Sequence, residues 1–102
     1  MTDGEAERRA KITAAVEAVR TRFLASFDDR LAELESLAAA ACAGDEDARV
    51  ALQRGLHTVA GTAPTLGLHD LGAAVRALEE AVGRGEPLGR GEVSAKLRTP
   101  RS

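Results

Sequence analysis

The feature that most constrains this fold is an uninterrupted apolar stripe between residues 12 and 41. Its members recur at steps of three or four residues and are Ile12, Val16, Val19, Phe23, Phe27, Leu31, Leu34, Leu37 and Ala41. That spacing places all of them on one face of an α-helix. Because no glycine or proline interrupts the run before Gly44, the stripe predicts either one long helix or two helices that break near Phe27. The sequence leaves these alternatives open.

Two further stripes follow the first. Gly44 ends the first helical segment, and Asp45 is a suitable cap for the next. The second stripe comprises Leu52, Leu56, Val59, Ala63 and Leu66. The third comprises Leu68, Leu71, Val75, Leu78 and Val82. Because short connections favour antiparallel neighbours, the predicted fold is all-α: an antiparallel up-and-down helix bundle, with four helices if the first stripe breaks.

The 102 residues suit a single small domain. We expect an N-terminal extension over residues 1–11, a helical domain over 12–83 and a flexible tail over 84–102, because glycines and Pro87 crowd the start of that tail. Val93 and Leu97, four residues apart, would support a short helix within it. If only three helices form, an apolar groove remains for the tail, for a second copy of the chain in a homodimer or for a partner.

The composition excludes several classes of function. A net charge of −2, with no Trp or Tyr, argues against nucleic-acid binding through a basic patch or by base stacking. The charged N-terminus lacks a signal-peptide core, and no apolar run is long enough to cross a bilayer, so we expect a cytoplasmic protein with no membrane partner. His57 and His69 lack further ligands at a metal-binding spacing, so no metal site is expected.

His57 is the candidate functional residue because it lies off the apolar stripe of its helix. At about 100° per residue, His57 projects about 140° away from Leu52, which predicts an imidazole that points to solvent. Gly61 and Pro64 follow it and weaken the helix. A surface with little side-chain bulk around a histidine allows close approach by another protein. The alternative is a helix that ends early and an ordinary surface histidine.

Residues 56–82, LHTVAGTAPTLGLHDLGAAVRALEEAV, resemble the histidine phosphotransfer (HPt) domain family. In that family a histidine is followed four residues later by glycine, then by small residues, and then by a glycine ahead of the next helix. The residues at those positions here are His57, Gly61, Thr62, Ala63 and Gly67. Residues 20–45 resemble the first long helix of the family, so the resemblance covers roughly residues 12–83.

The resemblance implies a phosphocarrier of a two-component phosphorelay with His57 as the phosphoryl acceptor. Its partner would be the receiver domain of a response regulator or of a hybrid histidine kinase, whose aspartate exchanges the phosphoryl group with Nε2 of the imidazole. The chain would have no cofactor of its own, and the receiver domain would supply Mg²⁺. The expected docking surface comprises Val50, Gln53, Arg54, Thr58, Ala60, Gly61 and Pro64.

Two features depart from the family pattern. Ala60 stands where many members carry a lysine, and the chain lacks a long C-terminal helix. Arg54, one turn before His57, is the nearest basic residue expected on the same face and would substitute for that lysine. The alternative function is therefore a helical interaction or dimerisation module of the same fold that transfers no phosphoryl group.

Overall fold

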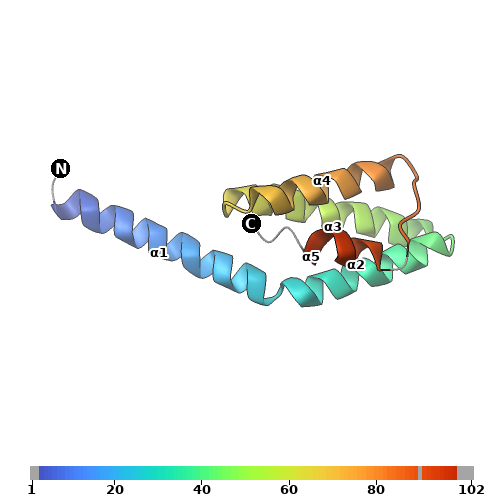
Figure 1. Cartoon of the computed structure of the whole chain (residues 1–102), viewed down its shortest axis with the longest axis horizontal. Helices are drawn as coiled ribbons and strands as arrows, with labels where there is room; N and C mark the ends of the chain where they lie inside the picture. The colour runs from blue at the N-terminus through green and yellow to red at the C-terminus, as the bar shows by residue number, and fades with distance from the viewer. Residues whose placement is uncertain (1–2, 90, 99–102) are drawn as a thin grey trace.

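The structure is a computed structural model that describes residues 3–89 and 91–98 (Figure 1). Every regular element in these residues is a helix, and they form no strand. The predicted all-α class is therefore confirmed. The helices are α1 (Asp3–Ala25), α2 (Phe27–Cys42), α3 (Glu46–Thr65), α4 (His69–Gly83) and α5 (Glu92–Arg98).

The long apolar stripe is divided between α1 and α2 at Ser26, which settles the alternative that the sequence left open. The hydroxyl of Ser26 donates a hydrogen bond to the carbonyl of Phe23 at 3.2 Å. The rings of Phe23 and Phe27 lie on either side of the break with their centroids 5.8 Å apart. On the N-terminal side of this junction α1 extends away from the other helices (Figure 1).

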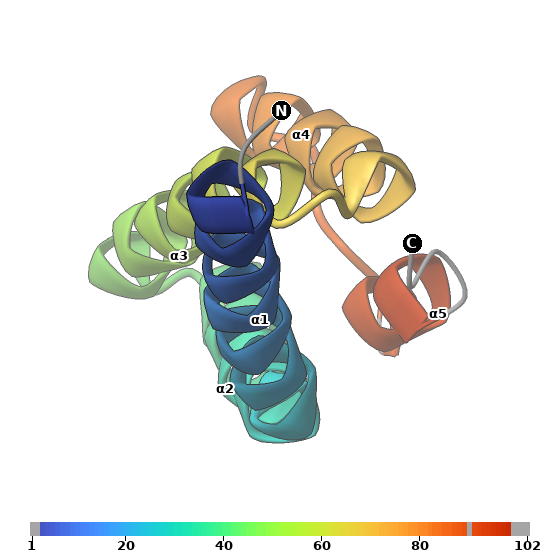
Figure 2. The same ribbon diagram turned by 90° about the vertical axis from the view of Figure 1, so that its left-hand side faces the viewer.

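The core lies among α2, α3, α4 and α5. Helix α3 packs against both α2 and α4, and α5 packs against the same two helices from another side (Figure 2). Burial of each large apolar side chain stabilises the fold by about 1.5–3 kcal/mol. The largest fully buried side chains are those of Phe27, Leu31, Leu52, Leu56, Leu68, Leu71, Leu78, Leu97, Val59, Val75 and Val93.

This core begins and ends later than the predicted domain of residues 12–83. Residues 3–11 of the predicted N-terminal extension form the first turns of α1, which continues without a break to Ala25. In the predicted flexible tail, Leu88, Val93 and Leu97 are buried, and the last two lie in α5. Helix α5 therefore fills the position that residues 12–26 were expected to fill. Residues 90 and 99–102 of the predicted tail lie outside the described residues.

Glu35 of α2 fixes the start of α5. Its carboxylate accepts hydrogen bonds from the backbone N–H of Gly91 at 3.2 Å and from that of Ser94 at 2.7 Å. The first N–H groups of a helix have no partner within the helix, and a carboxylate there also interacts favourably with the helix dipole. The contact therefore holds a seven-residue helix, too short to be stable alone, against α2.

We expect Glu35→Ala to lower the free energy of unfolding by about 1–3 kcal/mol, because two hydrogen bonds to a charged group are lost. Urea denaturation measures this change, and hydrogen exchange should show the amides of α5 losing protection before those of α3. Glu33→Ala is the matched control, since Glu33 is exposed on the same helix. Equal destabilisation by both variants would contradict the assigned role of Glu35.

Candidate functional site

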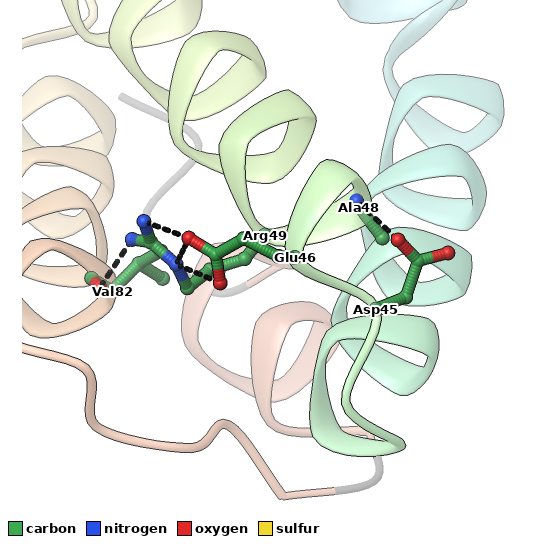
Figure 3. Close-up of polar contacts among 5 residues, drawn as sticks. All are labelled: Asp45, Glu46, Ala48, Arg49 and Val82. Carbon is green, nitrogen blue, oxygen red and sulfur yellow. Dashed lines mark hydrogen bonds and ion pairs between the residues drawn. The ribbon is translucent and has the colours of Figure 1, made fainter.

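The start of α3, the helix that carries the candidate site, is fixed by polar contacts (Figure 3). Asp45 caps the helix by accepting a hydrogen bond from the backbone N–H of Ala48 at 3.0 Å. Arg49 binds the carboxylate of Glu46 and also reaches the carbonyl of Val82, in the last turn of α4, at 3.5 Å. The hydrogen bond from Arg49 holds the pKa of Glu46 below its usual value. These contacts join the first turn of α3 to the end of α4.

The apolar face of α3 orients His57 toward solvent. Leu52, Leu56 and Val59 are at most 2% exposed because they face the core. His57 lies on the opposite side of the helix, and its side chain is 79% exposed. The outward orientation predicted from the helical spacing is therefore confirmed.

Among the residues that the structure describes, the imidazole of His57 has one close polar partner, Glu79 of α4. The distance between Nδ1 of His57 and Oε2 of Glu79 is 2.6 Å, and the side chain of Glu79 is only 20% exposed. Because a carboxylate can only accept hydrogen bonds, Nδ1 is the donor in this pair. The contact favours the tautomer with the proton on Nδ1, in which the lone pair lies on Nε2, the nitrogen farther from the backbone.

Glu79 was not among the predicted site residues, although it lies within residues 56–82, the segment that carries the family resemblance. Its signal was weak, because a glutamate beside the core residue Leu78 resembles any solvent-facing acid of an amphipathic helix. Only the packing of α4 against α3 brings it to His57, across 22 positions of sequence.

A shallow depression surrounds the imidazole. It is lined by Val50, Gln53, Arg54, His57, Thr58 and Glu79. The structure therefore brings together four of the predicted docking residues. The hydroxyl of Thr58 donates to the carbonyl of Arg54 at 3.0 Å, so it is directed at the helix backbone. Arg54 is exposed and is the cationic side chain of this depression.

Gly61, one turn beyond His57, keeps the adjacent surface flat. It is exposed, and a Cβ atom added there would meet no atom within 4 Å. Helix α3 continues past it and ends at Thr65, one residue after Pro64. The predicted surface with little side-chain bulk next to His57 is therefore present on a continuous helix.

Two of the predicted docking residues lie elsewhere. Ala60 is only 4% exposed because it lies in the core, so its inclusion in an exposed surface was wrong. Pro64 is half-buried, and its ring packs against Gly72 of α4. Both differences arise because the contact of α3 with α4 is wider than the apolar stripe alone indicates.

Neither of two other kinds of site is found in the described part of the chain. Across residues 3–89 and 91–98, no three His, Cys, Asp or Glu side chains gather as metal ligands. His69, at the start of α4, is exposed. None of the described helices combines the length and the apolar character that a membrane span requires.

The surroundings of Gly61 and Gly72 predict opposite effects of adding a methyl group. Gly61→Ala should raise the free energy of unfolding by about 0.5–1 kcal/mol, because alanine favours a helix and the space is open. Gly72→Ala should lower it, because the new Cβ would lie 2.9 Å from Cγ of the rigid Pro64 ring. Chemical denaturation of both variants measures the difference, and changes of the same sign would contradict this packing.

Comparison with protein families places this arrangement in context. The family model described as Hpt domain matches residues 18–99, which include α2, α3, α4 and α5 entirely. No curated protein and no solved structure gives a significant match. The matched range covers most of the chain and includes the core, His57 and Glu79, so the resemblance seen in the sequence is confirmed. The chain belongs to the Hpt domain family.

Proposed function

We propose that this chain is a phosphocarrier in which Nε2 of His57 accepts a phosphoryl group from a receiver-domain aspartate and donates it to another. Family membership indicates histidine phosphotransfer in a phosphorelay. The observation that favours His57 is its exposed imidazole, held through Nδ1 by Glu79. His69 has no such contact among the described hydrogen bonds. A cytoplasmic location is part of the proposal.

The proposed chemistry is a direct exchange between two proteins. The lone pair of Nε2 attacks the phosphorus of an aspartyl phosphate, so the P–N bond forms as the bond from phosphorus to the carboxylate oxygen breaks. The aspartate leaves as a carboxylate. The imidazole keeps its proton on Nδ1 and becomes positively charged, and the carboxylate of Glu79 at 2.6 Å stabilises this charge. Transfer to the next aspartate reverses these steps.

The proposed docking surface consists of Gly61 and the predicted residues that line the depression around His57; Pro64 is left out because its ring packs against Gly72. The bundle of α2, α3, α4 and α5 acts as an antiparallel four-helix scaffold that presents them. Arg54 supplies positive charge near the phosphoryl oxygens, in place of the lysine that many family members carry at the position of Ala60. Mg²⁺ would be held by the receiver domain, where it would neutralise the negative charge on the equatorial oxygens of the phosphoryl group during in-line transfer. The surface comprises Val50, Gln53, Arg54, Thr58 and Gly61.

A transfer assay tests the proposal. A receiver domain is phosphorylated with radiolabelled acetyl phosphate and Mg²⁺, freed of the donor and mixed with this chain. We expect label on the chain that is lost in acid and retained in base, as a phosphoramidate requires. Absence of label with several receiver domains, each shown to be phosphorylated, would favour the alternative of a non-transferring interaction module.

We expect Glu79→Ala to slow phosphoryl transfer by at least about tenfold, because a positioned hydrogen bond to the reacting imidazole is lost. Glu79→Gln should retain more activity, since its amide oxygen still accepts the Nδ1 proton. Nitrogen-15 NMR of the ring checks the cause: Glu79→Ala should reduce the fraction protonated on Nδ1. Glu80→Gln, exposed on the same helix, is the control. An unchanged tautomer in Glu79→Ala would contradict the assignment.

A further inference from the structure

Helix α1 carries an apolar surface that nothing in the described structure covers. Ile12, Val16 and Val19 are 58%, 41% and 45% exposed. Among the described helices α1 packs only against α2, and Figure 1 shows it projecting beyond the bundle. Most helical stability in proteins comes from packing of the apolar face. A projecting helix with such a face is therefore suited to a partner.

This surface lies apart from the proposed phosphotransfer site. Ile12 and Val16 precede residue 18, where the match to the family begins. The depression around His57 is lined by residues of α3 and α4 and by none of α1. A function of α1 is consequently separable from phosphoryl transfer.

The charges beside the stripe indicate what kind of partner fits. At about 100° per residue, the stripe from Ile12 to Phe23 spans about 60° of the helix circumference. Arg9 and Arg20 lie within about 40° of one edge, and Arg8 and Arg22 lie within about 60° of the other. The stripe thus has arginines along both edges. Two acids lie near them: Glu17, 3.9 Å from Arg20, and Glu5, one turn before Arg8 and Arg9. We name this surface, comprising the stripe and its four arginines, the α1 face.

We propose that the α1 face docks an acidic amphipathic helix of another protein. An apolar seam with acidic residues on its flanks would bury Ile12, Val16 and Val19 and pair with the arginines, as in a helix pair with complementary edge charges. A second copy of α1 is disfavoured, because each face carries four arginines against the two acids Glu5 and Glu17, so two such faces repel each other. A lipid surface is disfavoured, because the exposed members of the stripe are Ile and Val rather than the Trp, Phe and Leu typical of membrane-surface helices, and Phe23 packs against the core.

The test uses the full chain and two synthetic three-heptad peptides with leucine at positions a and d. One peptide carries glutamate at positions e and g, and the other carries lysine. We expect the glutamate peptide to bind at least about tenfold more tightly, with an affinity that falls as salt rises. Chemical-shift changes should be confined to residues of α1. Equal affinity for the two peptides would overturn the proposal.

Variants locate the interaction and separate its two components. Ile12→Glu should weaken binding of the glutamate peptide at least about tenfold, because it places a charge in the apolar seam. Ala39→Glu, at an exposed position of α2, is the matched control and should bind as the unmodified chain does. Arg9→Glu/Arg20→Glu leaves the apolar stripe intact and should reverse the preference between the peptides. This charge reversal tests the proposal even if Ile12→Glu unfolds α1, and an unreversed preference would overturn it.

The other occupants give distinct results. Sedimentation of the chain with phosphatidylglycerol vesicles, together with no binding of the glutamate peptide, would assign the α1 face to a lipid surface. A dimer in sedimentation equilibrium that Ile12→Glu dissolves would assign it to a second copy. Either result overturns the proposal and leaves phosphoryl transfer by His57 unaffected.

Discussion

His57→Gln is expected to abolish phosphoryl labelling of this chain in the transfer assay. Glutamine has a similar size and polarity, but its amide nitrogen has no lone pair available for attack on phosphorus. The side chain of His57 is 79% exposed, so the substitution leaves the core untouched and should change stability by no more than about 0.5 kcal/mol. Loss of label in a folded variant is therefore a chemical effect.

His69→Gln is the matched control for this experiment. His69 is the other histidine of the chain and is also exposed, at the start of α4. We expect this variant to accept phosphoryl groups at the rate of the unmodified chain. The opposite pattern, with label retained in His57→Gln and lost in His69→Gln, would show that the acceptor is His69 of α4 and would contradict the assignment to His57 of α3.

The second large effect is expected from Gly61→Arg, which should slow phosphoryl transfer by about 30-fold or more. A receiver domain must bring its aspartate to Nε2, and Gly61 keeps the surface one helical turn from His57 free of side chains. An arginine there would obstruct the centre of the contact, where single residues contribute about 2 kcal/mol or more. Circular dichroism should show an unchanged or higher helix content, because glycine is a poor helix former.

Two variants distinguish obstruction from other effects of Gly61→Arg. Gly61→Ala should transfer phosphoryl groups at close to the normal rate, since a methyl group adds little height. Ala32→Arg adds the same side chain to an exposed position of α2 and should leave transfer unchanged. A normal rate in Gly61→Arg would show that the receiver domain docks elsewhere.

The sequence predicted the helices better than their packing. Steps of three and four residues identified the buried faces of α2, α3 and α4, because these faces must be continuously apolar. The same pattern in α1 continued through Ile12, Val16 and Val19, which the structure leaves exposed. A stripe shows that a face is apolar but does not show what covers it. Val93 and Leu97 formed too short a pattern to reveal that α5 completes the core.

In the candidate site, too, the features of a single helix could be predicted from the sequence and the contacts between helices could not. His57 and Gly61 could be placed on the exposed face of α3 from helical spacing alone, since this is a property of one helix. Glu79 was missed, and Ala60 was wrongly placed in the docking surface, because both depend on how α4 lies against α3. His57 and Glu79 are separated by 22 positions of sequence. Predicting their contact requires the angle at which α3 and α4 pack, and the periodicity of a single helix does not give that angle.

The most direct test of the account is to locate the phosphoryl group on the labelled chain. Phosphopeptide mass spectrometry under alkaline conditions identifies the modified residue, and phosphorus–nitrogen couplings in NMR distinguish Nε2 from Nδ1. The account predicts a single phosphoryl group on Nε2 of His57, with Nδ1 still directed at Glu79. A phosphoryl group on Nδ1, on His69 or on any other side chain would contradict it.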